Sequence, residues 1–351
     1  MRGVLSPAAV LVLLAACERP SSTAADPARS RSQRAAPGDT AKMPEAKAPP
    51  APMSHGEAAV GMPSAPVERG AEAPPRSTTK VHRIRLETLH ARHAVAPGVT
   101  YDAWTFGGQV PGPTYRVTVG DSVDFTIVNK ALMPHSMDFH AAEIAPSRAY
   151  VNVMPNDSLH FGFRARTPGV FMYHCGTAPV AAHIANGMYG ALVVDPVTPR
   201  PKAREFVLVQ SEFYLGPKTG ADSVQSLDWQ RMLDLAPDYV TFNGVASQYA
   251  THPLQVDVGE PVRFYVVNAG PNRVSSFHVV GAVFDRVYLD GFGTPLRGVQ
   301  TFEVPVGGGM IFDVRLAEEG IYPFVSHAFA DATKGAVGML RAGNPSGGMS
   351  H

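Results

Sequence analysis

The chain has 351 residues, of which 45% are hydrophobic and 17% charged, and its 30 Lys and Arg balance its 30 Asp and Glu. This balance leaves no basic field of the kind that attracts nucleic acid, so a nucleic-acid partner is not expected. The 2 cysteines are too few for the disulfide framework of a small secreted scaffold.

The N-terminus resembles an export signal. Arg2 precedes an apolar run that ends in small residues before Cys17, and this run is too short to span a bilayer. The four residues that end at Cys17 resemble the lipobox of bacterial lipoproteins; an ordinary signal peptide is the alternative. We expect a lipoprotein signal peptide over 1–17, lipidation of Cys17, and export to the periplasm or cell surface. Glu18 is not the aspartate associated with inner-membrane retention, which favours the outer membrane.

Residues 18–80 are predicted to be a disordered tether. They are rich in Ala, Pro and Ser and hold almost no large aliphatic residues, so they cannot bury a core. Residues 344–351 are predicted to be a flexible tail. Met and His residues in both segments could collect copper loosely, but solvated low-complexity sequence is the favoured interpretation.

The rest of the chain has an all-β pattern. Short runs rich in β-branched and aromatic residues are separated by turns that contain Gly, Pro and Asn. The runs Tyr115–Asn129 and Leu254–Asn268 both alternate apolar and polar residues. Such alternation is typical of half-buried strands.

These two runs belong to a weak repeat. In each, a glycine (Gly120, Gly259) lies nine residues before an asparagine, and each run follows a Thr-Phe-x-Gly turn. The repeat length of roughly 140 residues is too long for a solenoid and indicates two copies of one domain. We expect β-sandwich domains at about 81–198 and 202–343, and only the first copy holds a cysteine.

The first copy carries a set of copper ligands. His135 lies in the loop after Tyr115–Asn129, while Cys175, His183 and Met188 come from one strand–loop unit, YHCGTAPVAAHIANGM. Two imidazoles, one thiolate and one weak thioether are the ligands of a blue-copper electron-transfer centre. A buried structural cysteine is the alternative.

Further histidines indicate a second metal. His174 adjoins Cys175 on a predicted strand, where successive side chains point to opposite faces, so the two residues can serve two metals joined by one peptide unit. His140 can reach the outer metal, and His327 holds the equivalent position in the second copy. Three neutral imidazoles leave a metal with positive charge and an open position, which favours a small anion as substrate.

Both copies look like cupredoxins, and residues 81–343 resemble the copper-containing nitrite reductases through the segments MPHSMDFH, YHCGTAPVAAHIANGM and YPFVSHAFADATKGAVGML. The resemblance implies an all-β fold of two tandem cupredoxin-like Greek-key sandwiches with two coppers per subunit. A type 1 copper would take electrons from a small redox protein, a cytochrome c or a cupredoxin. A type 2 copper would then reduce nitrite to nitric oxide in a dissimilatory, denitrification-type reaction.

The same resemblance implies a homotrimer with the type 2 site at the subunit interface, so that His327 would come from the neighbouring chain. Asp138 stands where the family keeps its proton-donating aspartate and would act as a general acid; a solvated aspartate is the alternative. His278 is the candidate for the histidine of the second domain that helps to deliver protons. The remaining histidines, His90 among them, are interpreted as surface or structural residues.

Two other functions share parts of this pattern. A small two-domain multicopper oxidase needs a trinuclear cluster, and hence several His-X-His pairs, including a histidine directly after the cysteine. Here Gly176 follows Cys175, and the chain lacks enough ligands for such a cluster. A non-catalytic blue-copper electron carrier needs only the type 1 ligands, which would leave His140, His174 and His327 unexplained. Nitrite reductase is therefore the favoured function.

Overall fold

The structure is a computed structural model that describes residues 70–219, 223–289 and 293–345, all within one compact unit, Ala48–His351. The predicted signal peptide, lipidation at Cys17, most of the predicted tether and most of the predicted tail lie outside these residues. Along the described ranges, no helix has the length and apolar character needed to cross a membrane.

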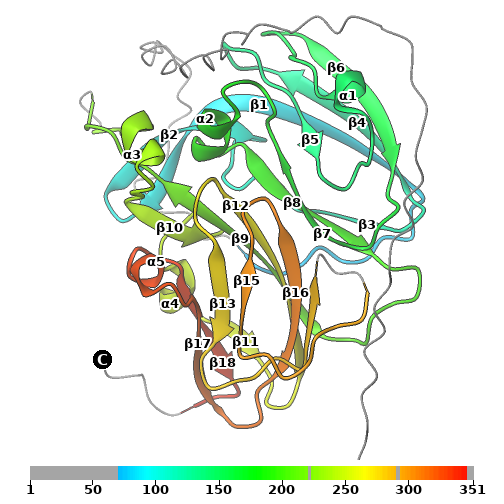
Figure 1. The fold of residues 1–351 in the computed structure, drawn as a ribbon, viewed down its shortest axis with the longest axis vertical. Coiled ribbons are helices and arrows are strands. Elements are labelled where there is room, and N and C mark those ends of the chain that lie inside the picture. Colours follow the sequence, from blue (N-terminus) through cyan, green and yellow to red (C-terminus); the bar gives the residue numbers. More distant parts are fainter. Residues whose placement is uncertain (1–69, 220–222, 290–292, 346–351) are drawn as a thin grey trace, which may run out of the picture. The chain divides into compact units, whose positions relative to one another are not determined.

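The first copy of the repeat folds into two four-stranded sheets, in the orders β2-β1-β4-β6 and β3-β8-β7-β5 (Figure 1). Two short helices, α1 and α2, lie in its loops. The elements are β1 (Val81–Ala96), β2 (Val99–Phe106), β3 (Tyr115–Thr118), β4 (Ser122–Asn129), β5 (Asp138–Phe139), α1 (Pro146–Ala149), β6 (Ser158–Arg164), β7 (Gly169–His174), α2 (Val180–Ala185) and β8 (Tyr189–Asp195).

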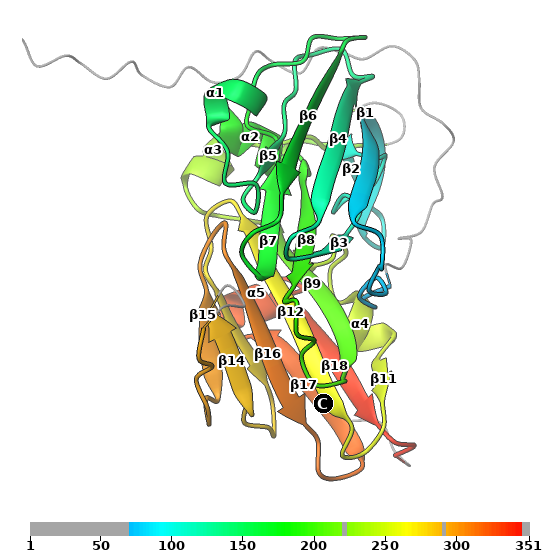
Figure 2. The same cartoon turned by 90° about the vertical axis from the view of Figure 1, so that its right-hand side faces the viewer.

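The second copy forms two five-stranded sheets, in the orders β10-β9-β12-β16-β14 and β11-β18-β17-β13-β15 (Figure 2). Its helices are again short. The elements are β9 (Arg204–Phe213), α3 (Trp229–Leu233), β10 (Tyr239–Phe242), α4 (Gln248–Thr251), β11 (Leu254–Val256), β12 (Pro261–Gly270), β13 (Ser275–Val279), β14 (Arg286–Leu289), β15 (Thr301–Val304), β16 (Gly309–Arg315), β17 (Gly320–Ser326), α5 (Phe329–Thr333) and β18 (Val337–Ala342).

The strand pairing confirms the repeat. β1 runs parallel to β4 as β9 runs parallel to β12, and β3 runs parallel to β8 as β11 runs parallel to β18. The matched asparagines also make equivalent hydrogen bonds: the side-chain amides of Asn129 and Asn268 each donate to two backbone carbonyls later in the same sandwich. The all-β, two-sandwich prediction is therefore correct, while the domain boundaries at 81–198 and 202–343 stay predictions.

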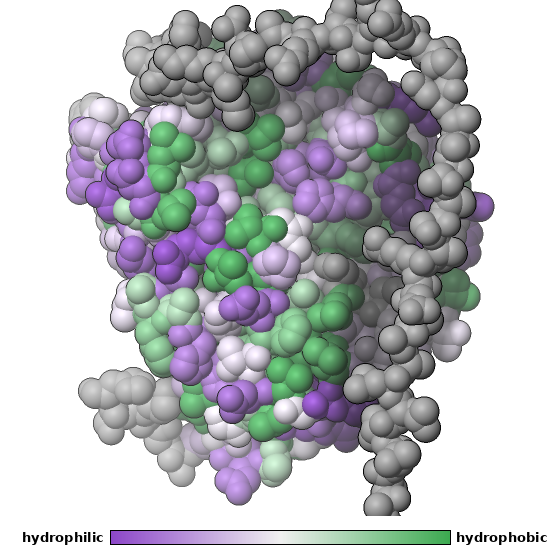
Figure 3. Space-filling view, viewed as in Figure 1, coloured by the Kyte–Doolittle hydropathy of each residue, from purple (hydrophilic) through white to green (hydrophobic). Residues whose placement is uncertain are grey.

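Each sandwich buries its own apolar core. In β4 the alternation places Phe125 and Ile127 inside the first core, which also contains Cys175 and Met188. A separate apolar cluster joins β7 and β8 to β9, β12 and β16. At that junction Gly309 has no room for a Cβ because the backbone of Val170 lies against it. Over the surface in Figure 3, hydrophobic and hydrophilic residues are mixed in small groups.

The segment 70–80 departs from the predicted tether. Ala71 is buried, its carbonyl accepts the Val207 N–H at 2.7 Å, and the Ala73 N–H donates to Glu205 at 3.0 Å. Arg76 adds an ion pair with Asp195. The segment is ordered by backbone pairing with β9, which requires few apolar side chains and so leaves little trace in composition.

Candidate metal centres

Three of the predicted type 1 ligands meet inside the first core. Nδ1 of His135 lies 3.2 Å from Nδ1 of His183, and Sγ of Cys175 lies 3.2 Å from His183 Nδ1 and 3.9 Å from His135 Nδ1. Cys175 and His135 are 0% exposed and His183 is 3% exposed. Met188 is buried in the same apolar cluster as Cys175.

Backbone hydrogen bonds hold these four residues in place. His135 exchanges both of its backbone hydrogen bonds with Val153, at 3.1 and 2.7 Å. Cys175 directly follows β7, and its N–H donates to the carbonyl of Met188 at 3.1 Å. The Met188 N–H donates in turn to the carbonyl of His183 in α2, also at 3.1 Å. Backbone hydrogen bonds therefore fix the positions of the predicted metal ligands.

The protonation of this cluster suits a soft metal ion. Burial, with His183 and His90 nearby, lowers the pKa of His135 to about 2, and burial with His90 lowers that of His183 to about 4. Both imidazoles are thus neutral at pH 7 and keep a lone pair for a metal. Burial raises the pKa of the Cys175 thiol, although hydrogen bonds from Ser136 and Thr177 act in the other direction. Two imidazoles and one thiol, all buried, fit a copper ion.

A second cluster lies at the junction of β5 and β7. Nε2 of His140 and Nε2 of His174 are 3.0 Å apart, and a carboxylate oxygen of Asp138 is 3.7 Å from His174 Nε2. Asp138 and His174 are opposite each other in the antiparallel pair β5–β7. His174 and Asp138 are partly exposed and His140 is exposed, so this cluster faces outward whereas Cys175 faces the core.

The two clusters are joined through His174. Its Nδ1–H donates to the carbonyl of Cys175 at 2.9 Å, which fixes the tautomer and leaves the Nε2 lone pair toward His140. The alternation predicted at the His174–Cys175 peptide is thus present in the structure.

His327 and His278 form a separate pair in the second sandwich. Their rings are 5.3 Å apart, and His327 also contacts the ring of Phe329 at 4.6 Å. His278 Nδ1–H donates to the carbonyl of Gln300 at 2.6 Å. Within the described part of the chain, His327 does not join Asp138, His140 and His174 in a ligand group, so one chain supplies two of the three predicted type 2 histidines to that cluster.

Four residues near the clusters were not identified from the sequence. The Ser136 N–H donates to Cys175 Sγ at 3.3 Å. Trp104 and His90 contact the rings of the buried histidine ligands. The hydroxyl of Tyr150 donates to the Phe139 carbonyl, and burial together with Asp138 raises its pKa. Ser136 lies beside a predicted ligand in sequence, which is a usable signal, whereas the other three reach the site only through tertiary packing.

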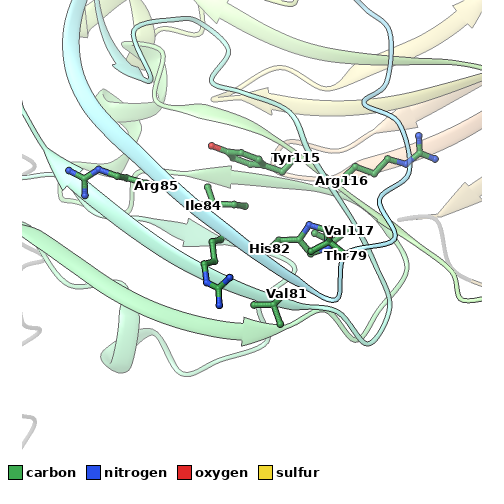
Figure 4. Close-up of a pocket in the computed structure, with 9 residues that line it drawn as sticks. Thr79, Val81, His82, Ile84, Arg85, Tyr115, Arg116 and Val117 are labelled. Atoms are coloured by element: carbon green, nitrogen blue, oxygen red, sulfur yellow. The ribbon is translucent and has the colours of Figure 1, made fainter.

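A hollow of about 450 Å³ lies apart from both clusters. It opens between the N-terminal half of β1 and β3, and Figure 4 shows the side chains around it. They are Thr79, Val81, His82, Arg83, Ile84, Arg85, Tyr115, Arg116 and Val117. None of the predicted ligands or proton donors is among them.

Comparisons with known proteins give the family. A family model described as "Multicopper oxidase" matches residues 89–199. A copper-containing nitrite reductase of Neisseria gonorrhoeae is 42% identical over 265 residues, which cover 74% of this chain and 68% of that protein. The chain belongs to the copper-containing nitrite reductases.

Solved structures agree with membership of the copper-containing nitrite reductases. The copper nitrite reductase from Nitrosomonas europaea matches with a TM-score of 0.70 and 37% identity, over 76% of this chain and 95% of that one. The copper-containing nitrite reductase from Thermus scotoductus matches with a TM-score of 0.67 and 32% identity, over 75% of this chain and 62% of that one. The family resemblance found in the sequence is confirmed.

Proposed function

We propose that this member of the nitrite reductase family reduces nitrite to nitric oxide by NO2⁻ + e⁻ + 2H⁺ → NO + H2O. One observation carries the proposal: the dipeptide His174–Cys175 places a ligand in each of two clusters, one buried and one outward-facing. An electron carrier needs the first cluster alone. The second cluster gives the electron a destination where a small anion can bind.

The four predicted type 1 residues, His135, Cys175, His183 and Met188, would hold one copper, which accepts and releases a single electron. Because these residues are fixed by backbone hydrogen bonds in the buried core, they would need little movement when a copper held there changes oxidation state. The peptide and the hydrogen bond between His174 and Cys175 then connect this cluster to the second one. We assign to these residues the one-electron route from a small redox protein, a cytochrome c or a cupredoxin.

The reaction consumes two protons, and we propose two residues as their source. The Asp138 carboxylate lies beside the His174 ligand atom, at the outward-facing cluster where the anion would bind. His278 uses Nδ1–H on the Gln300 carbonyl, which directs its Nε2 away from that contact as a site for proton exchange. We assign Asp138 as the general acid and His278 as the second proton-delivery residue.

The second metal site would be shared between chains. His140 and His174 provide two imidazoles on one sandwich, while His327 stands beside His278 on the other. A homotrimer in which the neighbouring chain's His327 completes the site would unite the copper ligands with the proton donors. This arrangement also explains why a single chain does not bring the three histidines together.

Export to the periplasm or cell surface with a lipid on Cys17 remains part of the proposal, with the outer membrane as the favoured membrane. Its support is the apolar run before Cys17 and the absence of an aspartate at position 18.

The function is tested with the full chain loaded with copper. Reduced cytochrome c and nitrite are added without oxygen, and nitric oxide is recorded with an electrode. Nitrite-dependent nitric oxide formation supports the proposal. Reduction of the blue site without nitric oxide would instead indicate an electron carrier. In a parallel assay with oxygen present, consumption of oxygen without nitric oxide formation would indicate an oxidase.

A further inference from the structure

Trp104 on β2 packs directly on the buried ligand cluster. Its ring centroid lies 4.9 Å from that of His183 in an edge-to-face arrangement and 6.2 Å from that of His135. Edge-to-face contacts at such distances are favourable for aromatic rings. Trp104 is therefore in van der Waals reach of both imidazoles of the predicted type 1 site.

His90 supports the ring of Trp104 from the other strand of the hairpin. The two residues are directly opposite each other in the antiparallel pair β1–β2, and their rings stack with centroids 5.6 Å apart and an interplanar angle of 11°. The His90 ring also lies 6.0 Å from that of His135. The cross-strand pair thus forms one aromatic layer over the two ligand imidazoles.

The backbone fixes this layer relative to the metal ligands. The Trp104 N–H donates to the carbonyl of Asn186 at 2.9 Å, in the loop that runs from His183 to Met188. The next residue, Gly187, has φ +114°, and a Cβ there would lie 2.6 Å from the side chain of Val110 and 3.1 Å from the Trp104 carbonyl. Strand and loop are therefore packed too closely to slide, and the indole stays over His183.

The layer differs from the ligands in its exposure. His135 and His183 are 0% and 3% exposed, so these residues offer almost no surface to a protein partner. Trp104 and His90 are both partly exposed. Trp104 is thus a partly exposed residue whose delocalised ring contacts the rings of both buried histidines.

We propose that Trp104, supported by His90, is the entry point for electrons into the His135–Cys175–His183 site. The inference rests on the electron route proposed above. In this step a reduced one-electron redox protein loses one electron and the type 1 site gains it; no bond forms or breaks and no proton moves. Trp104 is unchanged by the step and couples the redox protein to the type 1 site, while His90 positions the indole ring of Trp104.

Three variants of the copper-loaded full chain test the inference: Trp104→Leu, Trp104→Phe and, as a matched control, Trp229→Leu. Trp229 is the other tryptophan of the chain and packs against the cluster of Ala185, Tyr214 and Met232. The second-order rate at which reduced cytochrome c bleaches the blue absorption is measured by stopped flow. The absorption spectrum and the reduction potential of the blue site are recorded for each variant.

We expect Trp104→Leu to slow bleaching by cytochrome c by roughly tenfold or more, within the range over which association rates vary among variants of one interface. The blue spectrum, its potential and the rate of bleaching by dithionite should stay at wild-type values. Trp104→Phe should recover most of the rate and Trp229→Leu should retain all of it. A merely structural role would move the spectrum and the potential instead.

Two results would overturn the inference. One is a wild-type rate with cytochrome c in Trp104→Leu. The other is loss or displacement of the blue band in both Trp104 variants, which would assign Trp104 to ligand packing. Failure of the proposed function gives a different result: wild-type protein whose blue site is bleached through Trp104 but which forms no nitric oxide from nitrite.

Discussion

His174 turns its two ring nitrogens to different neighbours. Nδ1–H donates to the Cys175 carbonyl, and Nε2 lies 3.0 Å from Nε2 of His140. The tautomer is therefore set by a backbone group that belongs to the buried cluster. A metal ligand whose other nitrogen is held in this way keeps its orientation and gains basicity. One side chain thus connects the chemistry of both clusters.

The role of the single residue Asp138 can be tested with Asp138→Asn. The amide keeps the shape of the carboxyl group but cannot transfer a proton, so nitrite turnover should fall by about 10²–10⁴-fold, the usual contribution of general acid–base catalysis. Metal analysis and the visible spectrum should show both coppers retained. Asp124→Asn, on β4 beside His160, is the matched control and should turn over at the wild-type rate. Near-normal turnover of Asp138→Asn would assign Asp138 to another role.

Among the elements, most of the predicted type 1 ligands lie in the short connections between strands, and the strands fix the positions of these connections. The clustering of Cys175 with His183 could be predicted because Cys175, His183 and Met188 follow one strand in a spacing that suits a metal loop. The helix α2 that carries His183 was not predicted, since six residues are too few to show a helical period. Trp104 was also missed, because its contact with His183 depends on how β2 packs against a loop some eighty residues away in sequence.

The turn between β3 and β4 contains Asp121, whose contribution to stability should depend on pH. Burial alone would raise the pKa of Asp121, but hydrogen bonds from the Thr118 N–H, His82 and Lys80 hold it below its usual value. Because the pKa in the folded state is lowered, the stability from Asp121 is present above its unfolded-state pKa. That stability is lost as the pH falls through the folded-state pKa.

Asp121→Asn should therefore lower the free energy of unfolding at pH 7 by about 1–3 kcal/mol, the cost of leaving buried donors unpaired. The difference in the free energy of unfolding between variant and wild type should become smaller at acidic pH. Urea unfolding at several pH values measures this difference. Asp285→Asn breaks an exposed ion pair with Arg315 and should cost less than about 1 kcal/mol. An equal deficit of Asp121→Asn at every pH would contradict this account of the turn.

For the whole molecule, the repeat was visible in sequence because both copies use the same turns and the same asparagine. The side-chain amides of Asn129 and Asn268 donate to backbone carbonyls of their own sandwiches in the same way, so their spacing reflects a shared topology. The ordered segment 70–80 was not predicted, since its backbone pairs with β9 while its composition resembles the tether. The separation of His327 from His140 and His174 within one chain was expected only because the sequence resemblance implies a homotrimer. Nothing in the spacing of one chain indicates it.

The central claim is that two linked metal sites, the second completed by His327 of a neighbouring chain, pass one electron to nitrite. The decisive measurement reduces the blue site of the copper-loaded protein without oxygen, adds nitrite, and follows the blue absorption and nitric oxide together. In the wild type, the blue band should return with one nitric oxide released per electron. In His327→Ala, the bleached band should stay bleached, nitric oxide should be absent, and metal analysis should show one copper per chain. Return of the blue band with nitric oxide in His327→Ala at the wild-type rate would contradict the account.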